Sequence, residues 1–374
     1  MTRRRAKTEV KSTMGRPKVV LAMDREIHDE FLGRDDMERL SAFADVVLAS
    51  IPEGHGTPWF RANQDPAAEA ALGRELWDAD ALVVCHGAPR VGAALFEAAP
   101  RLRFVGELEG DRFADRIDVE AAWRHGAVAV DTTNGSSYPV AEWALALLLV
   151  SLRSGGFYFR RLLEPDTLGR GDRRPPVPER ELWGATVGLI GCGHIGRRLI
   201  SFLRPFACRI RVHDPYLSPE MADALGFELT SLDGVLARSD AVVCLAPLTP
   251  GTEHLLGRRE LGLLRAGTAF VNVSRGRVVD TEALVERLRR GDVTAGLDVF
   301  DPEPIPGDHP IKALRNVFLS PHIASHTEAT RKRFFALMVD ELQRFFDGDR
   351  PLFELTPRAL ANRRATPIET GGES

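Results

Sequence analysis

Three side chains able to handle an anion and a proton each follow a strand-like run of the sequence. Arg275 ends the apolar run 269–273, Glu303 lies in a proline-flanked loop, and His322 follows another strand end. A guanidinium can hold a carboxylate through two parallel hydrogen bonds. An imidazole can donate or accept a proton near neutral pH, and a carboxylate paired with it would orient the ring. Because ligands of open α/β sheets bind beyond the carboxyl ends of the strands, these positions predict an acid–base site there.

Each of these residues alone has a simpler interpretation. An arginine after a strand is usually a solvated surface cation, and an acidic, proline-rich loop is usually only a loop. His322 alone could be a core histidine with satisfied hydrogen bonds. His322 and His326 have the four-residue spacing of metal ligands on a helix, but no cysteine or third-ligand motif accompanies them. We therefore expect no metal.

The elements that would position these side chains are organised around a glycine-rich stretch. Residues 186–190 form an apolar run rich in β-branched residues, as in a strand buried on both faces. Gly191-Cys-Gly-His-Ile-Gly196 follows and opens a helical run, with glycines for a tight turn, for approach to a pyrophosphate and for helix packing. A second strand-like run, 209–213, ends at Asp214, where a carboxylate can accept from ribose hydroxyls. The order predicts a dinucleotide site; the simpler alternative is a glycine-rich turn on a structural α/β unit.

Composition limits the class of protein. The chain has 374 residues, of which 44% are hydrophobic and 27% charged, and its net charge of −4 argues against nucleic acid or anionic membrane as a partner. No apolar run reaches the ~18 residues of a membrane helix. The basic start, Met-Thr-Arg-Arg-Arg-Ala-Lys, lacks the apolar core of a secretory signal. The four cysteines form no C-x-x-C pair, which predicts buried, reduced thiols and a cytoplasmic location.

Strand-like runs alternate with helical stretches along most of the chain, which predicts parallel sheets covered by helices. The expected strands lie at 18–23, 45–49, 81–85, 103–106, 127–130, 186–190, 209–213, 241–245, 269–273, 294–298 and 317–320. Residues 140–150 predict a buried helix that is apolar all round, and 328–346 an amphipathic helix that returns to the first domain. Residues 51–66 and 164–180 predict irregular loops.

Several motifs occur in an order that resembles the D-isomer-specific 2-hydroxyacid dehydrogenases. After the glycine stretch they are His213-Asp-Pro-Tyr216, Leu245-Ala-Pro-Leu-Thr-Pro-Gly-Thr252, Val271-Asn-Val-Ser-Arg-Gly276, Gly296-Leu-Asp-Val-Phe-Asp-Pro-Glu-Pro304 and Ser320-Pro-His-Ile-Ala-Ser325. The resemblance covers most of residues 80–350. It implies two doubly wound parallel-sheet domains, with a Rossmann NAD-binding domain inserted in a flavodoxin-like substrate domain, usually in a homodimer. The boundaries we expect are a disordered leader at 1–17, a substrate domain at 18–138 and 324–356, the NAD-binding domain at 139–323, and a loose tail at 357–374.

The resemblance implies an enzyme that transfers a hydride between NAD(H) and a small D-2-hydroxy or 2-oxo acid. Arg275, Glu303 and His322 match the family's catalytic Arg-Glu-His set, in which arginine holds the carboxylate and histidine moves the proton. The implied cofactor contacts are Gly191, Gly193, His194, Ile195, Gly196, Asp214, Ala246, Thr252, Val273, Ser274, Arg275, Asp298, His322 and Ser325. His86, which follows the run 81–85 in the first domain, is a candidate substrate contact together with Arg275.

One stretch departs from the family pattern. The family usually has a Gly-x-Gly turn whose amides help hold the substrate carboxylate, whereas residues 106–118 read Gly-Glu-Leu-Glu-Gly-Asp-Arg-Phe-Ala-Asp-Arg-Ile-Asp. Glu107 and Glu109 are expected to put negative charge near an anionic substrate, which favours an unphosphorylated acid unless Arg112 or Arg116 turns inward. Two alternatives stay open: a phosphoglycerate dehydrogenase, and a non-enzymatic NADH-sensing corepressor-like protein, since that scaffold can keep the Arg-Glu-His set.

Overall fold

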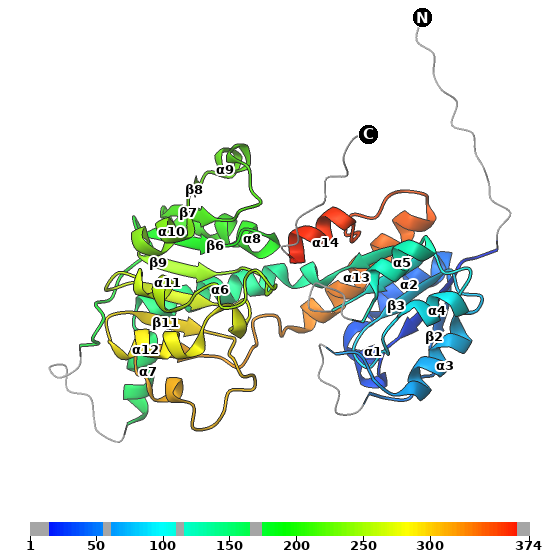
Figure 1. Cartoon of the computed structure of the whole chain (residues 1–374), viewed down its shortest axis with the longest axis horizontal. Coiled ribbons are helices and arrows are strands. Elements are labelled where there is room, and N and C mark those ends of the chain that lie inside the picture. The colour runs from blue at the N-terminus through cyan, green and yellow to red at the C-terminus, as the bar shows by residue number, and fades with distance from the viewer. Residues whose placement is uncertain (1–14, 55–60, 110–115, 165–173, 365–374) are drawn as a thin grey trace, which may run out of the picture. The chain divides into compact units, whose positions relative to one another are not determined.

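The structure is a computed structural model that describes residues 15–54, 61–109, 116–164 and 174–364 (Figure 1). It divides into two compact units. Unit 1 comprises Met1–Thr133 and Arg331–Thr356, and unit 2 comprises Asn134–Thr330 and Pro357–Ser374. Most of the expected leader, the centre of the atypical 106–118 stretch, half of the 164–180 loop and the end of the tail lie outside the described residues.

Unit 1 is built on a five-stranded parallel sheet. Its strands are β1 (Lys18–Ala22), β2 (Asp45–Leu48), β3 (Ala81–Val84), β4 (Phe104–Glu107) and β5 (Val128–Asp131). They are arranged in the order β2-β1-β3-β4-β5, which is the flavodoxin-like order. The chain reverses direction across the sheet between β1 and β3, so the loops after these strands open at the position where such sheets bind ligands.

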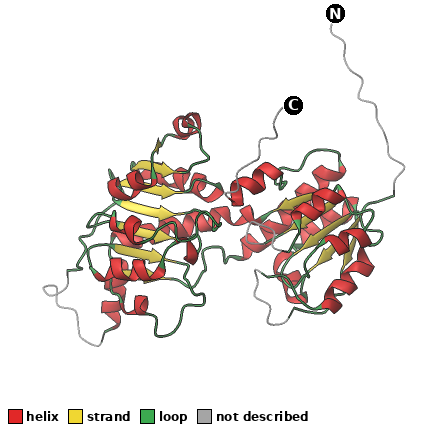
Figure 2. Ribbon diagram, viewed as in Figure 1, coloured by secondary structure: helices red, strands yellow, loops and turns green. Residues whose placement is uncertain are grey.

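Helices cover both faces of this sheet (Figure 2). They are α1 (Arg25–Phe31), α2 (Arg34–Phe43), α3 (Pro66–Leu76), α4 (Ala93–Ala98), α5 (Val119–His125) and, from the far end of the chain, α13 (Glu328–Phe346). The returning helix brings Phe334, Phe335 and Met338 into the same core as Phe104. A Cβ at Gly106 would lie 2.5 Å from the sulfur of Met338, so a larger residue at this strand position would have to displace the Met338 side chain.

Unit 2 is built on a seven-stranded parallel sheet. Its strands are β6 (Thr186–Ile190), β7 (Arg209–His213), β8 (Glu228–Leu229), β9 (Ala241–Cys244), β10 (Ala269–Asn272), β11 (Thr294–Leu297) and β12 (Val317–Leu319). They are arranged in the order β12-β11-β10-β9-β6-β7-β8, a doubly wound sheet whose direction reverses between β6 and β9. The two sheets confirm the fold class that the sequence predicts.

In its described part, unit 2 also contains eight helices, three of which begin at a side-chain N-cap. They are α6 (Ser137–Leu152), α7 (Gly155–Leu163), α8 (His194–Leu203), α9 (Pro219–Leu225), α10 (Leu232–Arg238), α11 (Arg258–Gly262), α12 (Thr281–Arg289) and α14 (Pro357–Arg364), with 3-10 turns at Thr133–Ser136, Arg204–Phe206, Gly276–Val278 and Pro310–Ala313. Ser218, Ser231 and Asp280 accept hydrogen bonds from the first turns of α9, α10 and α12. Because no apolar run marks β8 or α14, the sequence predicted no strand at 228–229 and a loose tail from residue 357.

The apolar helix expected at 140–150 is α6. With the turn before it, residues 133–152 are long and apolar enough to span a membrane by length and composition, although the sequence predicted no such segment. However, 61% of the most apolar window is buried within the protein. Ala144, Leu147 and Leu148 belong to the core that α6 shares with β6, α8 and β10. This burial is what a core helix requires.

Candidate active site

The glycine-rich loop lies between the end of β6 and the first turn of α8. Gly191 has a φ of +91°, and a Cβ there would lie 3.0 Å from the backbone nitrogen of Ala246, so both conformation and space require glycine. A Cβ at Gly196 would lie 3.0 Å from the carbonyl oxygen of Gly191. At Gly193 a Cβ would meet no atom within 4 Å. The loop is therefore tight against the protein at its ends and open in the middle, beside the amino end of a ten-residue helix.

Asp214 follows β7 and is anchored to this loop. Its Oδ2 accepts from the backbone N–H of Cys192 at 2.8 Å, and its Oδ1 accepts from the N–H of Tyr216 at 3.0 Å. Each carboxylate oxygen can accept a further hydrogen bond. The open space at Gly193, the helix terminus and the held carboxylate fit a dinucleotide: diphosphate at the amides, ribose at Asp214.

The other residues expected along the cofactor lie on the same carboxyl edge of the sheet. His194 and Ile195 begin α8, and Ala246 follows β9. Thr252 lies in the next loop, where its hydroxyl donates to the carbonyl of Pro247 and accepts from the N–H of Thr249 at 2.8 Å. The remaining expected contacts follow β10, β11 and β12 and are Val273, Ser274, Asp298 and Ser325.

His322 and Glu303 form a hydrogen-bonded pair beyond β11 and β12. Nδ1 of His322 donates to Oε1 of Glu303, and the two side chains are 22% and 36% exposed. Burial works against ionisation of Glu303. The hydrogen bond from His322 and the positive charges of His322 and Arg275 outweigh it, so the pKa of this carboxyl lies below its ordinary value.

Arg275 comes directly before a one-turn 3-10 helix that follows β10. Its Nη1 donates to the carbonyl oxygen of Ser274 at 2.8 Å, and its charge acts on Glu303. A Cβ at Gly276 would lie 1.8 Å from the carbonyl oxygen of Phe300, so the loop that carries Glu303 passes directly over this glycine. The structure therefore brings Arg275, Glu303 and His322 together at one edge of unit 2.

Comparison with known proteins gives the family. The sequence model of the family described as D-isomer specific 2-hydroxyacid dehydrogenase, NAD binding domain, matches residues 145–324. A glyoxylate reductase of Aeropyrum pernix is 34% identical over 362 residues, which are 96% of this chain and 100% of that protein. A D-3-phosphoglycerate dehydrogenase of Methanocaldococcus jannaschii is 34% identical over 274 residues, 73% of this chain and 51% of that protein. A solved phosphoglycerate oxidoreductase from Rhizobium etli has a TM-score of 0.74 and 26% identity, covering 91% of this chain and 99% of that one.

This chain belongs to the D-isomer-specific 2-hydroxyacid dehydrogenases. It is an NAD(H)-dependent oxidoreductase that interconverts 2-hydroxy and 2-oxo acids. The resemblance drawn from its motifs is thereby confirmed, and so is the cofactor.

His86, the expected substrate contact, lies in unit 1 of this dehydrogenase, directly after β3. Its Nε2 lies 3.3 Å from Oε2 of Glu109, and its ring meets Phe31 edge-on with centroids 5.4 Å apart. Both partners of the His86–Glu109 pair are more than four-fifths buried. Glu109 thus has a cationic partner whenever His86 is protonated.

Glu107 does not occupy the position that the sequence predicted for it. Its carboxylate bonds to Nη1 of Arg116, and both side chains are fully buried. The same nitrogen donates to the carbonyl oxygen of Glu109 at 2.9 Å. The expectation that Glu107 adds negative charge near the substrate is therefore wrong, because the side chain points into the core of unit 1 and is neutralised there. Arg112 lies outside the described residues.

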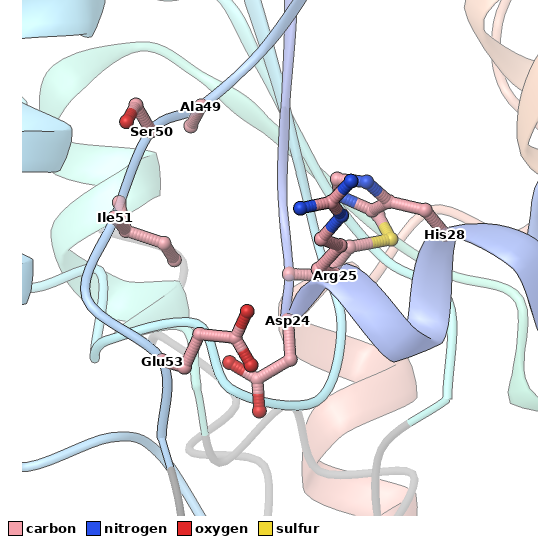
Figure 3. A pocket seen from close by; sticks show the side chains of 8 residues that line it. Asp24, Arg25, His28, Ala49, Ser50, Ile51 and Glu53 are labelled. Carbon is pink, nitrogen blue, oxygen red and sulfur yellow. The ribbon is translucent and has the colours of Figure 1, made fainter.

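A separate polar pocket of about 230 Å³ opens beyond β1 and β2 of the dehydrogenase (Figure 3). The carboxylates of Asp24 and Glu53 lie on the same side of it, and His28 and Arg25 lie on another (Figure 3). Oδ1 of Asp24 accepts from the N–H of Gly54 at 2.9 Å, which ties the loop after β1 to the loop after β2. The sequence did not predict this pocket, since its residues carry no motif.

Polar residues without an assigned role hold the turns of the active site. Oδ1 of Asn272, at the end of β10, accepts from the N–H and the hydroxyl of Ser274 at 3.0 and 2.8 Å, and its Nδ2 donates to the carbonyl of Arg275 at 3.3 Å. A polar residue that ends an otherwise apolar strand is the signal in the sequence for this role, and no motif marks it.

Proposed function

We propose that this dehydrogenase reduces a small, unphosphorylated 2-oxo acid, such as glyoxylate or hydroxypyruvate, with NADH. The observation that carries the proposal is the meeting of Arg275, Glu303 and His322 at the edge that also carries the glycine loop. A cation, a proton donor and a nucleotide site at one sheet edge are what reduction of a 2-oxo acid needs.

Each side chain has a distinct role in this proposal. Arg275 holds the substrate carboxylate and stabilises negative charge that develops on the carbonyl oxygen. Because Nδ1 of His322 is bonded to Glu303, Nε2 is the nitrogen that delivers the proton to that oxygen. Glu303 orients the ring and favours the imidazolium. NADH, when bound along α8 and Asp214, supplies the hydride.

The substrate class rests on the charges of unit 1, which we propose as the substrate domain. In the described parts of the loops 86–90 and 107–109, Arg90 is the cation, and its guanidinium lies 3.9 Å from Asp118. Arg116 is engaged by Glu107, and Glu109 adds a carboxylate beside His86. A phosphate needs several cations or clustered amides, which these loops do not offer among their described residues. The Aeropyrum glyoxylate reductase, similar along its whole length, supports the same substrate class.

The test compares kcat/KM for glyoxylate, hydroxypyruvate and 3-phosphohydroxypyruvate with NADH in one buffer. We expect the two unphosphorylated acids to be preferred by at least about 10-fold. Preference for the phosphorylated acid would instead make the chain a phosphoglycerate dehydrogenase. Failure to reduce any 2-oxo acid, with NADH still bound, would favour the corepressor-like alternative.

We also propose that NADH is preferred to NADPH. Asp214 is held in place by two backbone amides, so its carboxylate cannot easily turn away from a 2′-phosphate, which it would repel. Asp214→Asn should reduce the preference for NADH over NADPH, because it weakens NADH binding and removes the repulsion of the 2′-phosphate of NADPH. Equal kcat/KM for the two cofactors in the unmodified enzyme would contradict this proposal.

Finally, we propose a homodimer located in the cytoplasm. Tyr158, Phe159, Leu162 and Leu163 of α7 are exposed large apolar side chains in unit 2, an arrangement that favours burial against a second copy. Light scattering tests the dimer: Leu162→Glu with Leu163→Glu should yield monomers, whereas a monomeric unmodified protein would contradict it.

The location in the cytoplasm rests on the four cysteines, which are all free. Burial raises the pKa of Cys85 to about 12 and the pKa of Cys244 to about 11.

A further inference from the structure

The polar pocket beyond β1 and β2 has side chains of opposite charge on different sides (Figure 3). Arg25 and His28 lie three residues apart on α1, so they share one face of this helix. Asp24 and Glu53 lie on another side and come from the loops after β1 and β2. All of the residues that line the pocket belong to unit 1, so this pocket is formed without the glycine loop or the edge of unit 2.

The cationic side of the pocket has donors without partners. Among the residues that the structure describes, the guanidinium of Arg25 makes no hydrogen bond or ion pair. Nε2 of His28 is a buried atom that has no hydrogen-bond partner there either. A buried polar atom without a partner is unfavourable. An acceptor on a ligand, bonded to the Nε2–H tautomer of His28, would therefore be stabilised.

The acidic side is held in place by the backbone of neighbouring loops. The N–H of Asp24 donates to the carbonyl oxygen of His86 at 2.9 Å, and its Oδ1 accepts from the N–H of Gly54 at 2.9 Å. A Cβ at Gly87 would lie 1.9 Å from this oxygen, so the carboxylate packs directly on the loop after β3. Each carboxylate oxygen can accept more than one hydrogen bond, so Asp24 is a fixed acceptor with remaining capacity.

The rest of the lining limits the size of a ligand. Apart from Ser50 it is apolar: Met23 and Ala49 are buried, and Ile51 is half-buried. The volume of about 230 Å³ is below the roughly 300–1,000 Å³ of pockets that hold drug-sized ligands. The pocket therefore suits a molecule of a few non-hydrogen atoms with a short apolar side chain.

A ligand with a single charge fits this lining poorly. An anion would face Asp24, which forms no ion pair within the described part of the chain, and a cation would face Arg25. A molecule with both charges suits both sides. Its carboxylate can accept two parallel hydrogen bonds from a guanidinium, and its ammonium has three donors for carboxylates.

We propose that this pocket binds a small neutral α-amino acid in its zwitterionic form. The carboxylate of the amino acid lies at Arg25 and His28, and its ammonium lies at Asp24 and Glu53. This site goes beyond the proposed function, because it depends on none of the side chains that would bind the oxo acid in unit 2.

L-Alanine is the probe, and isothermal titration calorimetry on the full chain measures its dissociation constant, which we expect to be about 1 mM. Propionate lacks the ammonium and ethylamine lacks the carboxylate, so each keeps one charge of the same skeleton. Both should bind at least about 10-fold more weakly than L-alanine, since each loses hydrogen bonds between charged groups. Absence of L-alanine binding at about 10 mM would overturn the proposal. Propionate binding that equals that of L-alanine and is lost in Arg25→Gln would overturn it in favour of a simple anion site.

Arg25→Gln should weaken L-alanine binding about 10-fold, because it removes the cation that holds the carboxylate. Glu53→Gln, on the acidic side, should have a similar effect and serves if Arg25→Gln does not fold, which thermal unfolding checks. Arg34→Gln is the matched control, since this exposed arginine of α2 bonds to Glu38 outside the pocket, and it should leave the dissociation constant unchanged. Unchanged L-alanine binding in both pocket variants would overturn the proposal.

Arg275→Gln distinguishes this pocket from the active site. If L-alanine binds in the polar pocket, its dissociation constant should be the same in Arg275→Gln and in the unmodified protein. Binding that Arg275→Gln weakens and Arg25→Gln does not would place the amino acid in the active site and overturn the proposal. Because calorimetry needs no turnover, a failure of the proposed oxo acid reduction would leave this result unaffected.

Discussion

At the end of β4 in unit 1 two buried charged side chains bind to each other, whereas at the ends of β10 and β11 in unit 2 the buried polar side chains bind to the backbone of turns. Glu107 and Arg116 close on each other with no exposed surface. Asn272 and Asp298 instead accept from backbone amides and hold the turns that carry Arg275 and His322. The comparison separates two uses of buried polar groups. A closed ion pair is expected to stabilise its own domain, and a group bonded to a turn fixes the position of a different, partly exposed residue.

The largest effect that the comparison predicts is on His322. His322→Ala should lower kcat by about 10²–10⁴-fold, since it removes proton transfer, while the dissociation constant for NADH stays nearly unchanged. His86→Ala in unit 1 is the matched variant and should act mainly on KM for the oxo acid. Steady-state kinetics and fluorescence titration measure both. If His86→Ala lowered kcat as much as His322→Ala, the chemistry would not be confined to unit 2.

The next effect is on the stability of unit 1. Glu107→Gln leaves the buried charge of Arg116 without its anion and should lower the free energy of unfolding by about 3–5 kcal/mol. Urea denaturation provides the measurement, and Glu109→Gln should cost less than Glu107→Gln, because Glu109 is 18% exposed and its partner is His86. The double variant Glu107→Leu with Arg116→Met should recover most of the loss. Equal stability of Glu107→Gln and the unmodified protein would show that the pair is not structural.

A smaller effect is expected at Gly276, where unit 2 leaves no room for a side chain. Gly276→Ala should destabilise the protein by about 1–3 kcal/mol and lower kcat, because its Cβ would push the loop of Glu303 away from Arg275. Gly307→Ala is the control on the same loop, since a Cβ there would meet no atom within 4 Å. Thermal unfolding and kcat of the two variants sharpen the contrast. Equal melting temperatures and kcat values for the two variants would mean that the loop of Glu303 can move to accommodate the added methyl group.

The smallest effect is a change in pH dependence. The pKa of Glu303 lies below its ordinary value, so its carboxylate stays charged to lower pH than an ordinary glutamate would. Glu303→Gln removes the anion that is hydrogen-bonded to the proposed proton donor. The fall in kcat for reduction at rising pH should therefore move to lower pH by about one unit. A profile of kcat against pH with an unmoved alkaline limb would show that the pair does not tune His322.

The sequence predicted the two sheets because strands buried on both faces read as apolar runs that end at glycine, proline or charge. Eleven of the twelve strands start within one residue of the expected position for that reason, whereas β8 has only two residues and no apolar run. The proximity of Arg275, Glu303 and His322 could be predicted because motif and strand end coincide. The hydrogen bond from Trp143 to Ser320 could not, because α6 lies far away in sequence and only tertiary packing brings it to this turn.

Glu107 illustrates the opposite failure. Its position at the end of β4 suggested a side chain near the substrate, but the whole strand is buried and Arg116, nine residues later, pairs with this carboxylate inside unit 1. A lone sequence does not show which charges are neutralised by a partner, since the partner is chosen by the fold. For this reason the net charge of a pocket is harder to predict from sequence than the positions of its candidate catalytic residues.

The return of α13 to unit 1 affects how the chain can fold while it is being made. Unit 1 takes its second segment from Arg331–Thr356, and Phe334, Phe335 and Met338 fill the core around Phe104. A ribosome therefore completes most of unit 2 before it supplies the helix that covers the first sheet. The first segment of unit 1 is synthesised early but keeps an apolar sheet face exposed until α13 has been made. Unit 1 therefore cannot complete its fold before unit 2, and we expect chaperones to bind mainly to unit 1 during synthesis.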